Sequence, residues 1–79
     1  MSKEKTATRE VEITKEPVEL YKILKFEGLV SSGGEAKLVI DEGMVTVNGK
    51  VETQKRKKII SGDIIEFGEE RLLIGLAKH

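Results

Sequence analysis

Several residue types are absent or rare in this sequence, and each absence excludes a class of protein. There is no cysteine, which excludes disulfides and thiolate metal sites and permits a reducing compartment. The one histidine, His79, is the last residue, where it lacks the neighbours that position a catalytic imidazole. One tyrosine and two phenylalanines are too few aromatic residues for a protein that stacks successive bases of a single strand.

Long apolar runs are also missing. No run approaches the roughly 20 residues of a membrane helix. The N-terminal MSKEKTATRE has no apolar stretch of the kind found in signal peptides. We therefore expect a cytoplasmic protein with no membrane association. With 79 residues, the chain has room for one hydrophobic core, so we expect a flexible segment over residues 1–5 and a single domain over residues 6–79.

The charges balance overall but are unevenly distributed. The chain has 14 basic and 14 acidic side chains, while residues 50–58, here called the basic cluster, hold five cations and one anion. The four residues 55–58 are all cationic. A local cluster of one sign attracts a polyanion or an acidic surface even when the net charge is zero. We expect the acidic residues to lie on strands and chain ends, away from this cluster.

The hydrophobic pattern predicts a strand, two helices and then a small antiparallel sheet, which is the α+β class. The first strand is expected over residues 6–14. The first helix is expected to begin at Pro17, because proline is favoured at the first helical position. The second helix is expected to begin at Ser32, which has capping-box spacing to Glu35.

The second half of the chain shows short alternating segments separated by turn residues. Asn48-Gly49 is the strongest short signal of a two-residue hairpin, because both residues tolerate positive φ. The strands expected here cover residues 45–47, 50–53, 58–60, 64–67 and 71–76.

These signals occur in the order seen in a known family. The matching motifs are GLVSS (28–32), EAK (35–37), EGMV (42–45), VNGK (47–50) and GDII (62–65). From Glu19 to Glu66 the chain resembles the S-four-type RNA-binding domain, also called the alpha-L RNA-binding motif. It looks most like the small stand-alone bacterial members of the YaaA/YbcJ type. The resemblance implies two helices packed on a small sheet, and recognition of structured, often ribosomal, RNA by the helices and the hairpin.

The basic run at residues 55–58 has two interpretations from the residues alone. Clustered cations suit a phosphate-binding surface, because each phosphate contact releases condensed counterions. A charged, solvated loop that protects a sheet edge is the other interpretation, and the family resemblance favours RNA binding. If the run is extended, Lys55 and Lys57 share one side and Arg56 and Lys58 the other.

The start of the second helix is the other candidate site. Unpaired N–H groups beside Ser32 and Gly33 are suited to a phosphate, but simple capping of the helix by Ser32 and Glu35 is the favoured interpretation. We expect Tyr21 to belong to the core. The candidate RNA-binding residues, here called the basic face, are Lys22, Lys25, Ser32, Gly33, Lys37, Lys50, Lys55, Arg56, Lys57 and Lys58.

Three functions remain open. The first is a non-catalytic, monomeric module that binds structured RNA, ribosomal RNA foremost. The second is a protein–protein adaptor that meets an acidic partner, because Glu19 and Gly33 stand where many family members carry arginine. The third is a DNA binder, because charge alone does not distinguish polyanions. An enzyme is not expected, and neither a cofactor nor a metal is expected, since no carboxylates have EF-hand spacing.

Overall fold

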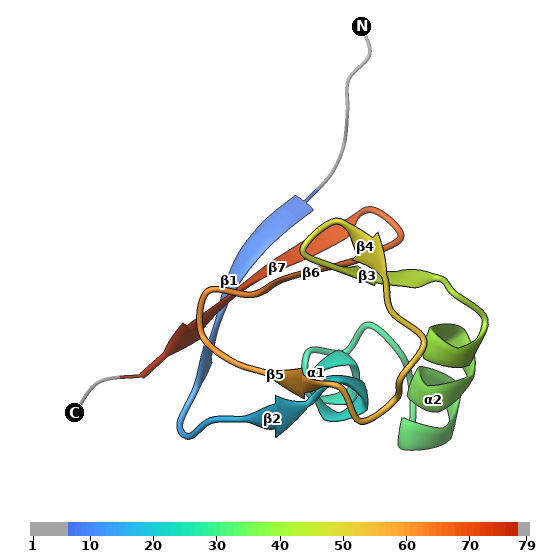
Figure 1. The fold of residues 1–79 in the computed structure, drawn as a ribbon, viewed down its shortest axis with the longest axis horizontal. Helices are drawn as coiled ribbons and strands as arrows, with labels where there is room; N and C mark the ends of the chain where they lie inside the picture. The colour runs from blue at the N-terminus through green and yellow to red at the C-terminus, as the bar shows by residue number, and fades with distance from the viewer. Residues whose placement is uncertain (1–6, 78–79) are drawn as a thin grey trace, which may run out of the picture.

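The structure, a computed structural model, describes residues 7–77, so the expected flexible segment 1–5 and His79 lie outside the described residues. Five strands form one sheet in the order β1-β7-β6-β3-β4, and β2 and β5 form a second sheet. Both helices lie on the same side of the larger sheet, which confirms the α+β class (Figure 1). The elements are β1 (Ala7–Ile13), β2 (Val18–Glu19), α1 (Leu20–Phe26), α2 (Gly33–Asp41), β3 (Val45–Val47), β4 (Lys50–Val51), β5 (Lys58–Ile59), β6 (Ile64–Phe67) and β7 (Glu70–Leu76).

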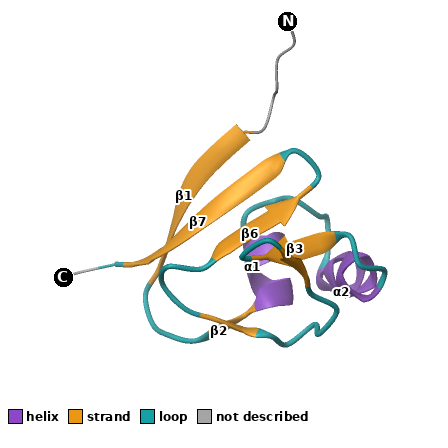
Figure 2. Cartoon of the chain, turned by 45° about the horizontal axis from the view of Figure 1, so that its top comes forward, coloured by secondary structure: helices purple, strands orange, loops and turns teal. Residues whose placement is uncertain are grey.

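The larger sheet is mixed, whereas the sequence predicted an antiparallel one. All seven residues of β1 pair with β7 in parallel, and the two strands run side by side along the molecule (Figure 2). The other pairs in this sheet are antiparallel. Two parallel neighbours need a long crossover connection, which the helices and remaining strands between β1 and β7 supply. The apolar–polar alternation that identified β1 does not indicate which strand it pairs with or in which direction.

The core lies between the two helices and the inner face of the larger sheet. Leu20, Ile23 and Leu24 of α1 are buried against it, as are Ala36 and Ile40 of α2. Full burial of one large aliphatic side chain contributes about 1.5–3 kcal/mol. No polar or charged side chain within residues 8–77 is buried. The buried stripes therefore determine which faces of α1 and α2 remain available for a partner.

Arg9 is the charged exception on the inner face of β1, and it connects three elements. Its Nη1 donates to the backbone carbonyl of Glu27 at 3.0 Å, and its Nη2 donates to Glu70 Oε1 at 3.0 Å. The carbonyl of Glu27 follows α1, where carbonyl groups lack partners within the helix. Arg9 therefore joins β1 to the end of α1 and to the first residue of β7.

The predicted start of the first helix at Pro17 is wrong. Val18 pairs with Ile59 and Glu19 with Lys58 in the β2–β5 sheet, and α1 begins only at Leu20. The pairing partners are about 40 positions away in sequence, so the residues near Pro17 give no indication that a strand precedes the helix. This two-stranded sheet brings the end of the basic cluster to the start of α1.

The hairpin after α2 is formed as predicted. Asn48 has a φ of 53° and Gly49 a φ of 84°, the two positive values that a tight hairpin turn requires. The returning strand β4 ends at Val51, two residues before the predicted end. The side chain of Asn48 also holds the turn before β6, because its Oδ1 accepts from Ile64 N at 2.9 Å and its Nδ2 donates to Asp63 Oδ1 at 3.0 Å.

Candidate nucleic-acid interface

The backbone of the basic run covers the N-terminal end of α1. The N–H of Leu20 donates to the carbonyl of Lys57 at 2.9 Å, and the N–H of Tyr21 donates to the carbonyl of Lys55 at 3.2 Å. The N-cap residue Glu19 makes no side-chain cap, so these two carbonyls provide partners for N–H groups that have none within the helix. The run is thereby fixed against α1, and this helix end is not open to a phosphate.

The four consecutive cations do not form one extended stretch. Residues 55 and 56 are in a turn, so the extended conformation on which the expected alternation of sides depended is not present over this part. Lys55 extends toward α2, where its Nζ lies 3.6 Å from Asp41 Oδ1. Arg56 is exposed at the turn. With this turn, the carbonyls of Lys55 and Lys57 both face the start of α1.

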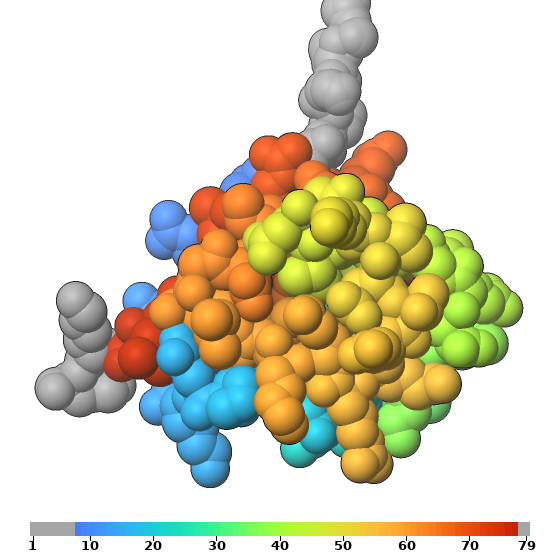
Figure 3. Space-filling model, viewed as in Figure 1, coloured from blue at the N-terminus to red at the C-terminus, as the bar shows by residue number. Residues whose placement is uncertain are grey.

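The last two cations of the run extend toward different neighbours. Lys57 lines a shallow depression together with Lys50 of the hairpin. Lys58 lines a groove together with Lys22 of α1 and with Lys15. In Figure 3, the segment that contains the run, gold to orange, fills the centre of one face between the hairpin (yellow) and the segment before α1 (blue). The run thus connects the cations of the hairpin with those of α1.

Tyr21 positions a second group of cations between the two helices. Lys37 Nζ lies 4.8 Å from the centroid of the Tyr21 ring and Lys22 Nζ lies 6.0 Å from it. A Cβ added at Gly33 would lie 4.0 Å from the same ring, which places the start of α2 against it. A cation over an aromatic ring gains about 0.5–1 kcal/mol at an exposed site. The ring packs against the core, as predicted, and is covered by Lys37.

Lys25 is exposed in the last turn of α1. A helix turns by about 100° per residue, so Lys25 projects between Tyr21 and Lys22 around the helix axis. It therefore extends the same cationic side of α1 toward the link between the helices.

The start of α2 is capped by its own side chains. Ser32 Oγ accepts from Glu35 N at 3.1 Å, as the spacing predicted. The carboxylate of Glu35 accepts from Ser31 N at 2.9 Å and from Ser31 Oγ at 2.7 Å, whereas a standard capping box would use the N–H of Ser32. These bonds, that of the backbone N–H first, lower the pKa of Glu35. A carboxylate at this entrance supports the capping interpretation over a phosphate site.

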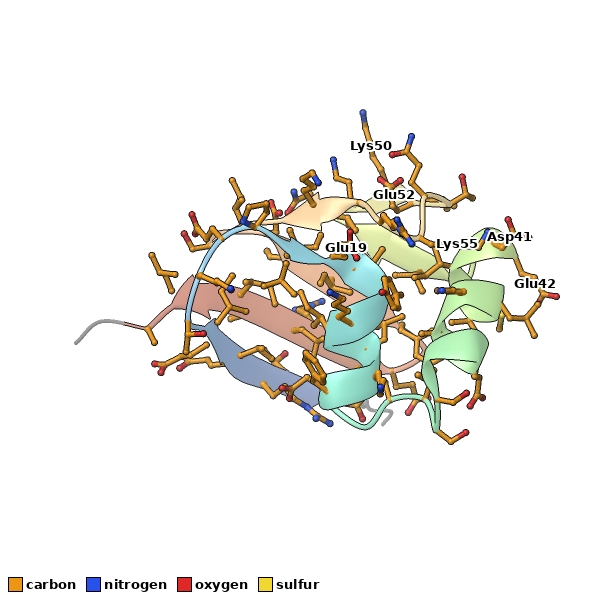
Figure 4. All side chains as sticks on the ribbon, turned by 90° about the horizontal axis from the view of Figure 1, so that it is seen from below. Glu19, Asp41, Glu42, Lys50, Glu52 and Lys55 are labelled. Carbon is orange, nitrogen blue, oxygen red and sulfur yellow. The ribbon has the colours of Figure 1, made fainter. Side chains whose placement is uncertain are left out.

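Acidic residues lie within the basic face, so the prediction that they are kept away from it is wrong. Glu19 Oε1 lies 3.8 Å from Lys22 Nζ, and Asp41 is beside Lys55 (Figure 4). Six cations of the basic face form no ion pair with any carboxylate of residues 7–77: Lys25, Lys37, Lys50, Arg56, Lys57 and Lys58.

Sequence reasoning missed Lys15, which the structure places in the groove with Lys22 and Lys58. Nothing in the local sequence marks it, because its position depends on the pairing of Glu19 with Lys58. Across residues 7–77, no group of three or more metal-ligating side chains is found. The described helices are too short and too polar to cross a membrane.

Two short helices lie on one side of a small sheet, and cations project from both helices and from the loop fixed against α1, so the chain is a compact α+β module with exposed cations on several elements. The family model of the S4 domain matches residues 11–75. The chain belongs to the S4 domain family, and the resemblance inferred from the motifs is confirmed.

Two relatives show how far the sequence likeness extends. The chain is 52% identical over 50 residues to YbcJ of Escherichia coli (strain K12), described as a candidate RNA-binding protein, and the match covers 63% of this chain and 71% of YbcJ. It is 32% identical over 57 residues to RlbA of Bacillus subtilis (strain 168), described as a candidate ribosome maturation protein. That match covers 72% of this chain and 80% of RlbA.

Two solved structures share the fold. The solution structure of YbcJ from E. coli, described as containing an alpha-L motif involved in RNA binding, superimposes with a TM-score of 0.63 and 37% identity. The superposition covers 95% of this chain and 94% of YbcJ. The 30S ribosomal protein S4e from Thermoplasma acidophilum gives a TM-score of 0.61 at 27% identity, over 73% of this chain and 31% of S4e.

Proposed function

We propose that this chain is a non-catalytic, monomeric module that binds structured RNA, ribosomal RNA foremost, through the basic face. The observation that carries the proposal is the capping of α1 by the carbonyls of Lys55 and Lys57. It fixes the backbone of the basic run beside Lys22 before any partner arrives, so binding does not have to order that backbone. Membership of the S4 domain family and the likeness to YbcJ support RNA as the polyanion. The domain is proposed to extend over residues 6–79.

The composition of the face favours recognition of phosphates and shape over recognition of bases. Its unpaired cations project from α1, α2, the hairpin and the loop, and the Tyr21 ring is covered by Lys37. Phosphate contacts set the position and affinity of a protein on a nucleic acid but carry no sequence information directly. Structured RNA offers such contacts across its wide minor groove. We therefore expect strong dependence on salt and weak dependence on sequence.

The test is fluorescence anisotropy with a labelled fragment of ribosomal RNA, titrated at salt concentrations from about 50 to 200 mM. If all six unpaired cations contact phosphates, the slope of log K against log salt is about −4 to −5. Lys57→Gln is expected to weaken binding and to make the slope about one unit shallower. The matched control is Thr8→Glu on the outer face of β1, which changes the net charge by the same amount and is expected to leave the slope unchanged.

Other outcomes contradict the proposal in different ways. Absence of binding at low salt would exclude RNA as the partner. Duplex DNA that competes as well as folded RNA would indicate a general polyanion binder. An acidic protein partner whose capture survives nuclease treatment, and which Lys57→Gln abolishes, would indicate the adaptor.

A further inference from the structure

Phe26 is the most exposed large hydrophobic side chain of the described part of the chain. Its exposed fraction is 69%, whereas the other aromatic residues, Tyr21 and Phe67, pack against the core. A solitary exposed apolar side chain needs no explanation by itself. Phe26, however, lies on the wall of a groove, and that groove also contains cations of the basic face.

The groove lies between β1, the connection from β1 to β2, and the outer side of α1. Its two halves are adjoining depressions that share Thr14, Val18 and Phe26 in their walls. The first half is mainly apolar and its walls are formed by Val11, Ile13 and Ile23, with Glu12 and Glu27 at the rim. The second half is lined by Pro17 and Glu19 and by three cations, Lys15, Lys22 and Lys58.

The two halves suit the two ends of one ligand. A flat apolar group fits beside Phe26 and Val18, whereas an anionic group is attracted by Lys15, Lys22 and Lys58. Glu19, the one anion of the second half, lies within 3.8 Å of Lys22, so the net charge of that half is positive. At the other end, the carboxylate of Glu12 repels a phosphate and can accept a hydrogen bond from a base amino group, whereas Glu27 is paired with Arg9 at 3.4 Å. A nucleotide has this combination of a stacking base and an attached phosphate.

We propose that this groove holds one unpaired nucleotide of a bound RNA, with its base stacked on Phe26 and its phosphate among Lys15, Lys22 and Lys58. The inference rests on the proposed function, and it adds a site for a base to a face that otherwise contacts phosphates. The groove is continuous with the basic face, because Lys22 and Lys58 belong to both. An RNA helix lying on the basic face therefore has its nearest flipped-out base within reach of Phe26.

The test uses two labelled RNA hairpins that differ at one position of the stem. One carries an unpaired adenosine, and the other carries an abasic site with the same backbone, which removes the base and keeps the phosphate. The protein is expected to bind the adenosine hairpin about 5- to 150-fold more tightly, the range that one stacked base supplies. Phe26→Ala is expected to make the two affinities equal, and Phe26→Tyr to preserve the difference.

Leu38→Ala is the matched control, because Leu38 is another exposed large hydrophobic residue, at 54%, and lies on α2. It is expected to keep the preference for the adenosine. The ring protons of Phe26 are expected to shift upfield in the NMR spectrum when the adenosine hairpin binds, and not with the abasic hairpin. Both substitutions are at exposed positions, so thermal unfolding is expected to be little changed.

The outcomes separate this inference from the proposed function. If the protein binds both hairpins equally, the groove does not hold a base, while RNA binding by the basic face stands. If the protein binds neither hairpin at low salt, the proposed function fails and this inference with it. If Leu38→Ala removes the preference as fully as Phe26→Ala does, the base is not recognised in the groove.

Discussion

Asp41 is expected to weaken RNA binding by the basic face, so neutralising it should strengthen that binding. Its Oδ1 lies 3.6 Å from Lys55 Nζ, and both side chains are substantially exposed, at 63% and 43%. The ion pair holds Lys55 against α2 and offsets its charge. The change Asp41→Asn keeps the shape of the side chain and removes the anion.

The magnitude follows from the distances. A phosphate oxygen hydrogen-bonded to Lys55 would lie no more than about 6.5 Å from the carboxylate, given the observed 3.6 Å pair and one further hydrogen bond. Two unit charges at about 6.5 Å repel each other by about 0.6 kcal/mol in water. Screening at about 0.1 M salt reduces this value, and the lower effective dielectric constant of an interface raises it. We therefore expect Asp41→Asn to tighten binding about threefold, and Glu19→Gln, which releases Lys22, to act similarly.

The assay is anisotropy titration of the ribosomal RNA fragment at low and moderate salt. Stability is expected to be unchanged, because exposed ion pairs contribute about 0–1 kcal/mol and a carboxylate at the last residue of a helix opposes the helix dipole. The control is Glu10→Gln, which changes the net charge equally. Glu10 lies on the outer face of β1, opposite to the inward Val11, and is expected to change affinity by less than about 1.5-fold.

Two results would refute this reasoning. If Glu10→Gln strengthens binding as much as Asp41→Asn does, net charge alone governs affinity and the basic face has no defined location. If Asp41→Asn weakens binding, Asp41 positions Lys55 for its contact instead of competing with the phosphate.

Three further predictions follow from the turn, the cap of α2 and its first residue. Asn48→Ala removes two side-chain hydrogen bonds and places alanine at positive φ, so we expect urea unfolding to show a loss of about 2 kcal/mol. The pKa of Glu35 lies below its ordinary value of 4.5 in the folded chain, so its contribution is present above that value and is lost as pH falls through the folded pKa. Glu35→Gln should therefore flatten the decline of stability below about pH 4.5 in acid-unfolding curves. Gly33→Arg should fit, because a Cβ there meets only the Tyr21 ring at 4.0 Å, and the added cation should tighten binding of the RNA fragment two- to fivefold, by about 0.4–1 kcal/mol.

Each of these predictions has a contrary result. Unchanged urea unfolding of Asn48→Ala would mean that the turn holds without the side chain. The pKa of Glu16 is also lowered, by hydrogen bonds from Ser61, so the stability of Glu35→Gln should still decline somewhat in acid. If its stability declines with falling pH as steeply as that of the unsubstituted chain, Glu35 does not contribute to the acid dependence. Gly33→Arg tests whether the start of α2 faces the RNA, and weaker or equal binding would place it outside the interface.

Local signals predicted the elements whose structure depends on their own residues. The hairpin at Asn48-Gly49 and the cap at Ser32 were found because positive φ and helix capping depend on residue type at one or two positions. The strand at 64–67 was predicted with its observed bounds, since turn residues flank it on both sides. The parallel pairing of β1 and the pairing of β2 with β5 could not be predicted, because each joins segments at least 39 residues apart.

The same distinction applies to the candidate site. The cations of the basic face were identified from their clustering and from the family motifs, and the structure locates each of them. The ion pair of Asp41 with Lys55 and the position of Lys15 beside Lys58 depend on tertiary packing, so sequence reasoning predicted neither. The exposure of Phe26 could not be predicted either, since a large apolar residue on a helix is usually buried.

The use of backbone carbonyls to cap α1 explains why the cations of residues 55–57 lie in a loop and not in a helix. α1 has seven residues, which is too short to be stable alone, and the side chain of its N-cap residue, Glu19, makes no capping hydrogen bond. The loop supplies the missing acceptors through the carbonyls of Lys55 and Lys57, while both residues stay partly exposed. Any residue type could provide these accepting carbonyls, so selection at residues 55–58 is free to act on charge. The fold thus needs the backbone of this run, and RNA binding, as proposed, needs its side chains. Substitution of the lysines by glutamine should therefore change affinity and leave folding intact.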